Sequence, residues 1–337
     1  MRTPVSDPLR IGPYQVLGRL GSGGMGWVYF GRSPGGRAVA VKVVRPEYAA
    51  DPDFRRRFAR EVTAARAVSG AYTAEVVDAD TDGDPPWLAT VYVAGPSLQE
   101  AIKEHGPLSE PEVRLLGVRL VRALQAIHSA GVVHRDLKPS NVLLAEDGPR
   151  VIDFGISLVA GTTTLTGTGV VMGTPSYMAP EQVRAARVGP AGDVFSLGGV
   201  LAFAATGESP FGGGSDVFYR IVHEEPTLGA APAGLREVLA RCLDKDPARR
   251  QSLPALLAEL AGRAGHAGPA GRMAASPWPR AVAENIHQHA AEAAARRSGT
   301  GGRGMAMRSN LLLHAQTLLE AGLTDELVVE AVARARA

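Results

Sequence analysis

Residues 134–141 bring together three side chains that could act on a phosphate group. Asp136 supplies a carboxylate, Lys138 an ammonium group and Asn141 an amide, directly before an apolar run at 142–144. Transfer of a phosphoryl group from ATP needs all three. The carboxylate accepts or orients the proton of the attacking hydroxyl, the ammonium neutralises the moving phosphate, and the amide helps to hold Mg²⁺. The segment therefore predicts a loop that catalyses phosphoryl transfer.

The same segment reads H-R-D-L-K-P-x-N, the catalytic-loop signature of protein kinases. The chain thus resembles the eukaryotic-like (Hanks-type) serine/threonine protein kinases, most of all those of actinobacteria. The resemblance implies a bilobal α+β fold: a small antiparallel sheet with one helix, αC, forms the N-lobe, and a larger, mainly helical part forms the C-lobe. It also implies ATP with Mg²⁺ or Mn²⁺ as cofactors, and serine or threonine side chains of proteins as acceptors.

Three further charged residues occupy positions that this resemblance requires. Lys42, in a Val-Ala-Val-Lys run, resembles the lysine that holds the α- and β-phosphates, and Glu61 is its best partner on helix αC. Asp153 opens an Asp-Phe-Gly triplet and resembles the residue that chelates Mg²⁺, with Asn141 as a second metal ligand. Pseudokinases usually lose Lys42, Asp136 or Asp153, so their presence favours an enzyme over the alternative, a nucleotide-binding scaffold.

A glycine-rich loop lies before Lys42 in the sequence. It fits G-x-G-x-x-G, whose free backbone N–H groups can cover phosphates, with the residues Gly21, Ser22, Gly23, Gly24, Met25 and Gly26. With 40 glycines in 337 residues, chance alone gives about half a match per chain, and a second match at 299–304 has no strand beside it. The first lies between strand-like runs at 14–17 and 27–30. A dinucleotide-binding loop would need a helix there, so we expect a hairpin over phosphates.

The resemblance also implies an apolar adenine pocket between the lobes. The roof of the pocket is expected at Leu20, Val28 and Ala40, and its floor at Leu143. Thr90 is the expected gatekeeper, and Val91 and Val93 belong to the expected hinge. The hinge contacts adenine through backbone groups, so valine at 91, where relatives usually carry glutamate, should not impair binding. The alternative for the apolar residues is ordinary core packing, which accounts for most of their contribution to stability.

The segment 153–181 resembles a kinase activation segment. Its end, at 173–181, matches the kinase pattern, and the resemblance gives Thr174 contacts with Asp136 and Lys138 that shape the acceptor pocket. Lys138 and the Gly-Thr-Pro triplet at 173–175 are the serine/threonine-kinase pattern. A full activation segment serves to bind a peptide, which disfavours a small-molecule phosphotransferase.

Arg135 precedes the catalytic aspartate, the pattern in which a cationic pocket waits for a phosphorylated loop. By position, Thr166 and Thr168 best match the phosphosites of bacterial relatives. A phosphate adds nearly two negative charges that arginine can order, so we expect activation by autophosphorylation, with a homodimer as the route for transfer in trans. The alternative is that threonines are merely common in a solvated loop.

Three other charged residues are expected to be structural. Glu181 and Arg250 resemble the family's buried ion pair between the activation segment and a late helix. Asp193 begins a run that resembles the buried helix anchoring the C-lobe. His134 should pack beneath the active site rather than act as a base.

Composition excludes several other classes of protein. With 36 basic and 34 acidic residues the formal charge is +2, too balanced for an electrostatic nucleic-acid binder. The single Cys242 excludes an internal disulfide framework and is consistent with a reducing cytosol. The apolar, uncharged run at 194–207 is too short to span a bilayer, and no signal peptide is evident. We therefore expect a cytoplasmic protein without a membrane span or external sensor.

The chain is expected to divide at changes of composition. The expected parts are an N-terminal extension at 1–13, a kinase domain at 14–264 with lobes meeting near 93–94, a flexible Ala/Gly/Arg/Pro-rich linker at 265–308, and a helical hairpin at 309–337. A disordered tail is the alternative for the hairpin. Every catalytic motif lies before residue 265, so a chain ending there is expected to keep ATP binding and basal transfer.

Overall fold

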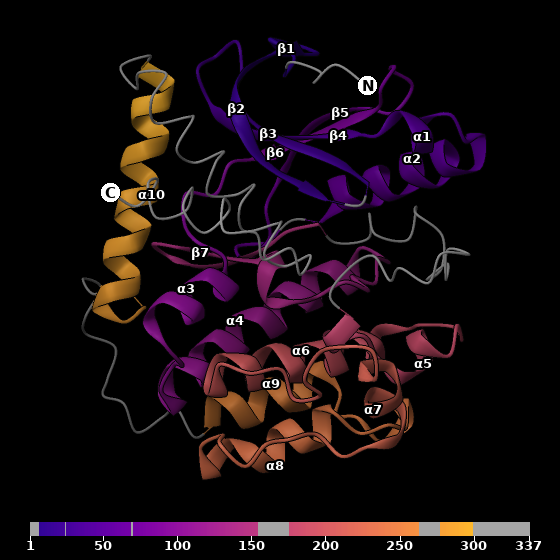
Figure 1. The fold of residues 1–337 in the computed structure, drawn as a ribbon, viewed down its shortest axis with the longest axis vertical. Helices are drawn as coiled ribbons and strands as arrows, with labels where there is room; N and C mark the ends of the chain where they lie inside the picture. Colours follow the sequence, from indigo (N-terminus) through magenta and orange to yellow (C-terminus); the bar gives the residue numbers. More distant parts are fainter. Residues whose placement is uncertain (1–6, 24, 69, 154–174, 263–276, 299–337) are drawn as a thin grey trace, which may run out of the picture. The chain divides into compact units, whose positions relative to one another are not determined.

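The computed structural model describes residues 7–23, 25–68, 70–153, 175–262 and 277–298 (Figure 1). The chain divides into two compact units, and each is described by itself. The first contains Met1–Pro46, Val77–Tyr92 and Ala290–Ala337, and the second contains Glu47–Val76 and Val93–His289. The expected hairpin at 309–337 lies outside the described residues.

A β-sheet forms most of the first unit. Its strands lie in the order β1-β2-β3-β4-β6-β5, and the pairings of β1 with β2, β2 with β3, β3 with β4 and β4 with β6 are antiparallel. The strands are β1 (Arg10–Ile11), β2 (Tyr14–Gly23), β3 (Gly26–Arg32), β4 (Ala38–Val44), β5 (Val76–Asp80) and β6 (Trp87–Val91). Strand β1 lies inside the expected N-terminal extension, so the sheet begins before residue 14.

Strand β4 shows how the sequence positions the lysine of this sheet. Successive side chains of a strand point to opposite faces, and Val39, Val41 and Val43 point to the buried face, where they are 0, 0 and 6% exposed. They belong to an apolar cluster that includes Trp87 of β6. Lys42 therefore lies on the other face of the sheet.

The second unit is mainly helical, as expected. The helices after the first strands are α1 (Pro46–Ala49), α2 (Pro52–Ala67), α3 (Leu98–His105), α4 (Glu110–Ser129), α5 (Pro180–Val183), α6 (Pro190–Thr206), α7 (Val217–His223), α8 (Ala233–Cys242), α9 (Leu253–Gly262) and α10 (Arg280–Ser298), of which residues 290–298 belong to the first unit. Strands β7 (Val142–Ala145) and β8 (Gly148–Val151) pair antiparallel, and three residues before β7, Pro139–Asn141, form a short 3-10 helix.

Helix α4 forms the centre of this unit because its apolar residues recur at helical spacing. Leu116, Leu120, Leu124 and Ile127 are all 0% exposed, and α4 packs against α6 and α9. A capping box, in which Ser109 and Glu112 share hydrogen bonds, defines where the helix begins. None of the helices in the described residues combines the length and the hydropathy of a bilayer-spanning segment.

Helix α2, expected to accompany the sheet of the N-lobe, groups instead with the second unit. The physical reason is that the C-terminal end of α2 packs into the core of the second unit. Ala65 and the following Val68 are 2 and 5% exposed and belong to the apolar core that α4 also builds. Gly70, two residues later, approaches Ala126 of α4 so closely that a Cβ there would lie 3.1 Å from the alanine side chain.

The expectation of a linker over 265–308 is wrong for residues 280–298, which form helix α10. Trp278, just before this helix, and Val282 and Ile286 within it are 6, 1 and 3% exposed and belong to the core of the second unit. A spacing of four residues places these three side chains on one face. Alanine is the commonest residue of 280–298, so the composition of this segment resembled that of a linker. The three large side chains nevertheless pack in the core.

Candidate active site

The three side chains that suggested phosphoryl transfer do lie together. Lys138 Nζ donates to both carboxylate oxygens of Asp136, at 3.0 and 2.9 Å. Asn141 Nδ2 donates to the Asp136 carbonyl at 2.8 Å and to its Oδ2 at 3.1 Å. The Asp136 side chain is 31% exposed. These bonds hold the carboxylate of Asp136 in one orientation.

A single buried carboxylate holds the backbone of this loop. Asp193, in the first turn of α6, is 0% exposed. Its Oδ2 accepts from the His134 amide and its Oδ1 from the Arg135 amide, both at 2.8 Å. His128, at the end of α4, places Nε2 2.6 Å from Oδ2 of Asp193. The catalytic loop is thus tied to the two central helices of the core.

Arg135 adopts a backbone conformation that few residues other than glycine tolerate. Its φ is 64°, in the left-handed region. Such a conformation costs about 1–3 kcal/mol and persists only where the surroundings enforce it. The Arg135 amide is held by Asp193, and its carbonyl accepts from Gln182 Nε2 at 2.9 Å. Bonds on both sides of the residue therefore hold the turn that precedes Asp136.

His134 is placed as a structural residue. It is fully buried, and burial lowers the pKa of its imidazole. Its Nδ1 accepts from the Asp136 amide at 3.3 Å. The ring lies beneath the loop without access to solvent and supports the Asp136 backbone.

The expected metal ligands are an amide and a carboxylate at the two ends of the β7–β8 hairpin. Asn141 precedes β7 and uses its Nδ2 on Asp136, so its Oδ1 is the atom suited to a cation. Asp153 follows β8, and the amide of the intervening Ile152 donates to the Asn141 carbonyl at 3.0 Å. Oxygen donors are the ligands that Mg²⁺ prefers, so these residues fit that ion.

Glu61 lies on α2, and it is partly buried. Burial raises the pKa of Glu61 to about 7, while the positive charges of Arg135, Arg57 and Arg60 act in the opposite direction. Its Oε2 has no hydrogen-bond partner among the residues that the structure describes. Lys42 belongs to the first unit, so the pairing of Lys42 with Glu61 stays a prediction.

The first unit supplies the expected phosphate-covering loop as a β-hairpin, as the sequence indicated. Gly23 pairs with Gly26 at its tip, and Gly21 pairs with Val28. A Cβ at Gly21 or Gly23 would meet nothing within 4 Å, whereas one at Gly26 would lie 1.9 Å from the Val43 carbonyl oxygen. The hairpin therefore has open space on its glycine side and needs Gly26 where β3 meets β4. Ser22 and Met25 lie on the same hairpin, and Leu20 falls in a register shift of β2 between residues 19 and 21.

Strand register places the expected roof of the adenine pocket on one face of this sheet. Val28 pairs with Lys42, and Ala40 pairs with Thr90. Paired residues of an antiparallel ladder point to the same side, so these four side chains share the face opposite the buried valines of β4. Val91 ends β6 on the adjacent strand.

The second unit holds the remaining members of the expected pocket. Val93 begins the chain segment after the sheet, and Leu143 lies on β7. Leu143 is partly exposed while its neighbours Val142 and Leu144 are 0% exposed, so it points away from the core. Leu143 also bridges to Ser97. Gly24, Thr166, Thr168 and Thr174 lie outside the described residues.

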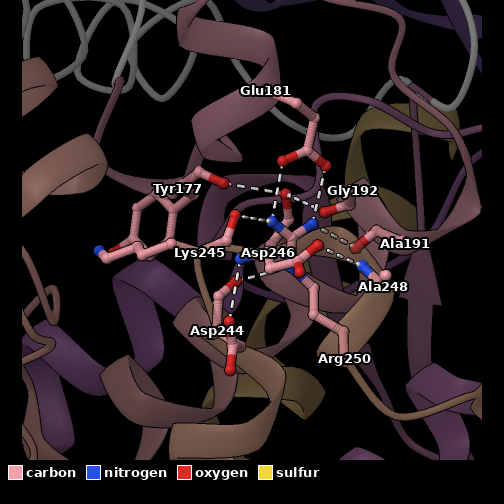
Figure 2. A network of polar contacts seen from close by, with 10 residues as sticks. Tyr177, Glu181, Ala191, Gly192, Asp244, Lys245, Asp246, Ala248 and Arg250 are labelled. Carbon is pink, nitrogen blue, oxygen red and sulfur yellow. Dashed lines mark hydrogen bonds and ion pairs between the residues drawn. The ribbon is translucent and has the colours of Figure 1, made fainter.

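The expected structural ion pair is present and bidentate (Figure 2). Arg250 Nη1 and Nη2 donate to Glu181 Oε1 and Oε2 at 2.7 and 2.8 Å, and the two side chains are 0 and 11% exposed. Arg250 also donates to the carbonyls of Ala191 and Asp244 at 2.9 and 2.8 Å. The pair joins α5 to the N-terminus of α6 and to the loop after α8.

Sequence reasoning missed three residues that position this site. His128 and Gln182 hold the catalytic loop, but their partners lie 65 and 47 residues away along the chain. Gly95 lies so close to β7 that a Cβ would be 1.9 Å from the Leu144 carbonyl oxygen. The signal for Gly95 was its place directly after the expected hinge; no local pattern marked the other two.

Comparison with known proteins gives the family. The protein kinase domain model matches residues 14–260. Probable serine/threonine-protein kinase PkwA of Thermomonospora curvata is 54% identical over 76% of this chain and 35% of its own length; AfsK of Streptomyces griseus is 56% identical over 76% and 32%. The chain thus spans about a third of these relatives.

Solved structures agree with this match. The kinase domain of PknI from Mycobacterium tuberculosis is 28% identical, with a TM-score of 0.62 over 77% of this chain and 100% of that one. The described fold has the same two parts, an antiparallel sheet and a mainly helical unit. With its catalytic loop, its buried ion pair and these relatives, the chain belongs to the protein kinase domain family, beside serine/threonine kinases of actinobacteria.

Proposed function

We propose that this chain transfers the γ-phosphate of ATP to serine or threonine side chains of proteins. The observation that carries the proposal is the arrangement around Asp136, where Lys138 and Asn141 donate four hydrogen bonds to one residue. A carboxylate held in this way keeps one geometry for an incoming hydroxyl, which is the main demand of phosphoryl transfer on a protein.

The side chains divide the work of the reaction. Asp136 accepts or orients the proton of the acceptor hydroxyl, and Lys138 beside it places a positive charge where the phosphoryl group moves. Asn141 and Asp153 would hold Mg²⁺ or Mn²⁺, which when bound neutralises phosphate charge. Lys42, on the face of the sheet opposite the buried valines of β4, would hold the α- and β-phosphates.

The test is incubation of the purified chain with labelled ATP, Mg²⁺ and a generic protein acceptor. Asp136→Asn should reduce incorporation by about 10³-fold or more, because the groups of such a site act as a unit. The matched control is Asp147→Asn, a change of the same type at a carboxylate that is 71% exposed in the β7–β8 turn. Undiminished transfer by Asp136→Asn would refute the mechanism, and an inactive wild type that still binds ATP would favour a scaffold.

We also propose that phosphorylation of Thr166, Thr168 or both increases activity. Arg135 lies directly before Asp136 and carries the charge that would bind such a phosphate. The double variant Thr166→Ala/Thr168→Ala should turn over more slowly after preincubation with ATP, and phosphosite mapping should find phosphate within 153–181. Full activity of the double variant, with phosphate only elsewhere, would contradict this.

The proposed reaction also suggests which residues form the catalytic domain, where it acts and how two copies meet. We propose that residues 14–264 form the catalytic domain, that it works in the cytoplasm where ATP is available, and that two copies meet transiently when one phosphorylates the other. Inactive Asp136→Asn protein mixed with wild type tests the last point: it should become phosphorylated, at a rate that rises with the concentration of both chains.

A further inference from the structure

Helix α10 lies beyond residue 260, where the match to the kinase domain model ends. Its first half nevertheless belongs to the core of the second unit. The buried positions Trp278, Val282, Asn285 and Ile286 recur at helical spacing, and each is at most 8% exposed. In Figure 1 this end of α10 lies beside α3. A segment outside the common domain thus has a side chain pattern that specifies one docked position.

Two hydrogen bonds identify the elements that this segment holds. Trp278 Nε1 donates to the carbonyl of Ala145, the last residue of β7, at 2.6 Å. Asn285 Nδ2 donates to Glu104 of α3 at 3.1 Å. Between these contacts, Val282 and Ile286 share an apolar cluster with Leu98 and Leu144, which are both 0% exposed.

The elements that α10 touches are the ones that carry the second unit's share of the nucleotide site. Strand β7 begins directly after Asn141 and contains Leu143, the expected floor of the adenine pocket. Leu144 of the same strand donates its amide to the Pro96 carbonyl at 2.8 Å, close to the expected hinge. Helix α3 packs against both β7 and the short helix that includes Asn141.

We propose that Trp278 and the first half of helix α10 are positioning elements of the nucleotide site, which hold β7 and α3 in the geometry that ATP requires. This inference rests on the proposed function. Trp278 acts on β7 mainly through the packing of its ring in the core and also through its bond to the Ala145 carbonyl, so its loss should weaken nucleotide binding more than it slows transfer. It also reverses the expectation that a chain ending at residue 265 would bind ATP normally.

The test uses the full chain with three substitutions. Trp278→Ala removes both the ring and the donor, Trp278→Phe keeps most of the ring and removes the donor, and Gln288→Ala changes an exposed residue of the same helix. We expect Trp278→Ala to raise the KM for ATP about five- to tenfold while kcat stays within about twofold, because a change that weakens the binding of the ground state and the transition state equally raises KM and leaves kcat unchanged. Trp278→Phe should recover most of that loss, and Gln288→Ala should match wild type.

Binding is also measured without catalysis, so that the two proposals can fail separately. The thermal stabilisation given by Mg²⁺ and a non-hydrolysable ATP analogue reports the dissociation constant, and it should weaken in the order Gln288→Ala, Trp278→Phe, Trp278→Ala. Unchanged KM and analogue binding in both Trp278 variants would overturn the inference, as would a fall in kcat with KM unaltered. If Trp278→Ala does not fold, Trp278→Phe and Asn285→Ala decide by the same measurements. An inactive wild type that binds the analogue with this order of variants overturns only the proposed function.

Discussion

The buried pair of Glu181 and Arg250 allows a sharp prediction about stability. Glu181→Gln keeps the size of the side chain and removes its charge. The guanidinium of Arg250, 0% exposed, then has no negative partner, although its bonds to the Ala191 and Asp244 carbonyls remain. Breaking a buried pair from one side leaves an uncompensated charge, which is the costly case.

The magnitude follows from the bonds. Two charge-assisted hydrogen bonds are lost, each worth about 1.5–3 kcal/mol, and the glutamine oxygen restores one ordinary bond of about 1 kcal/mol. The expected loss is therefore about 2–5 kcal/mol, consistent with the 3–5 kcal/mol or so typical of broken buried pairs. For a domain of this size, each kcal/mol lowers Tm by about 2–4 °C, so a loss of about 3 kcal/mol lowers it by about 6–12 °C.

The assay is thermal and urea unfolding of the full chain. The control is Glu237→Gln, which removes one of the two carboxylate partners of Arg241 at a side chain that is 78% exposed, and it should cost less than about 1 kcal/mol. The double variant Glu181→Met/Arg250→Met should lose less than the sum of the two single changes, because it leaves no unpaired charge. The reasoning would be refuted if Glu181→Gln had the same Tm as Glu237→Gln. It would also be refuted if the loss of unfolding free energy in Glu181→Met/Arg250→Met equalled the sum of the losses in the two single variants.

The remaining predictions concern pH, packing and catalysis. Burial raises the pKa of Glu61 from 4.5 to about 7, so between pH 4.5 and about 7 only the folded chain keeps the proton, and the unfolding free energy falls as pH rises. Glu61→Gln should flatten this dependence of the unfolding free energy on pH, whereas Glu292→Gln, at an exposed residue, should not. An unchanged pH dependence in Glu61→Gln would contradict the assignment. Gly95→Ala should lower the unfolding free energy by about 1–3 kcal/mol because its Cβ would meet the Leu144 carbonyl, whereas Gly213→Ala, with nothing within 4 Å, should be neutral in urea unfolding. Lys42→Met and Asp153→Asn should each nearly abolish transfer, and the double variant should be no worse in a single-turnover assay.

The parts of the site that sequence predicts well are those whose partners are close along the chain. Asp136, Lys138 and Asn141 meet because they share one short loop, and strand alternation alone places Lys42 opposite the buried valines of β4. The long helix α4 is readable because its buried residues are dense and periodic. In each case the local pattern and the final packing agree.

The parts that sequence does not predict depend on distant partners. Trp278, Val282 and Ile286 have helical spacing, but mostly small or polar residues separate them. Only their packing with the core of the second unit and the bond of Trp278 to β7 explain why they are buried. His128 is a polar residue at the end of an apolar helix, and its role appears only when Asp193, 65 residues on, lies beside it. Glu181 and Arg250 were expected as a pair through resemblance, since no spacing rule joins residues 69 apart.

The carboxylate of Asp193 couples the opening of the catalytic loop to the unfolding of the helical core. An amide hydrogen exchanges with solvent only when its hydrogen bond opens. The amides of His134 and Arg135 are bonded to a side chain in the first turn of a helix that is buried on nearly every side. Their exchange should therefore be as slow as that of the interior amides of α6, and heating should abolish catalysis in the same cooperative step that melts the core.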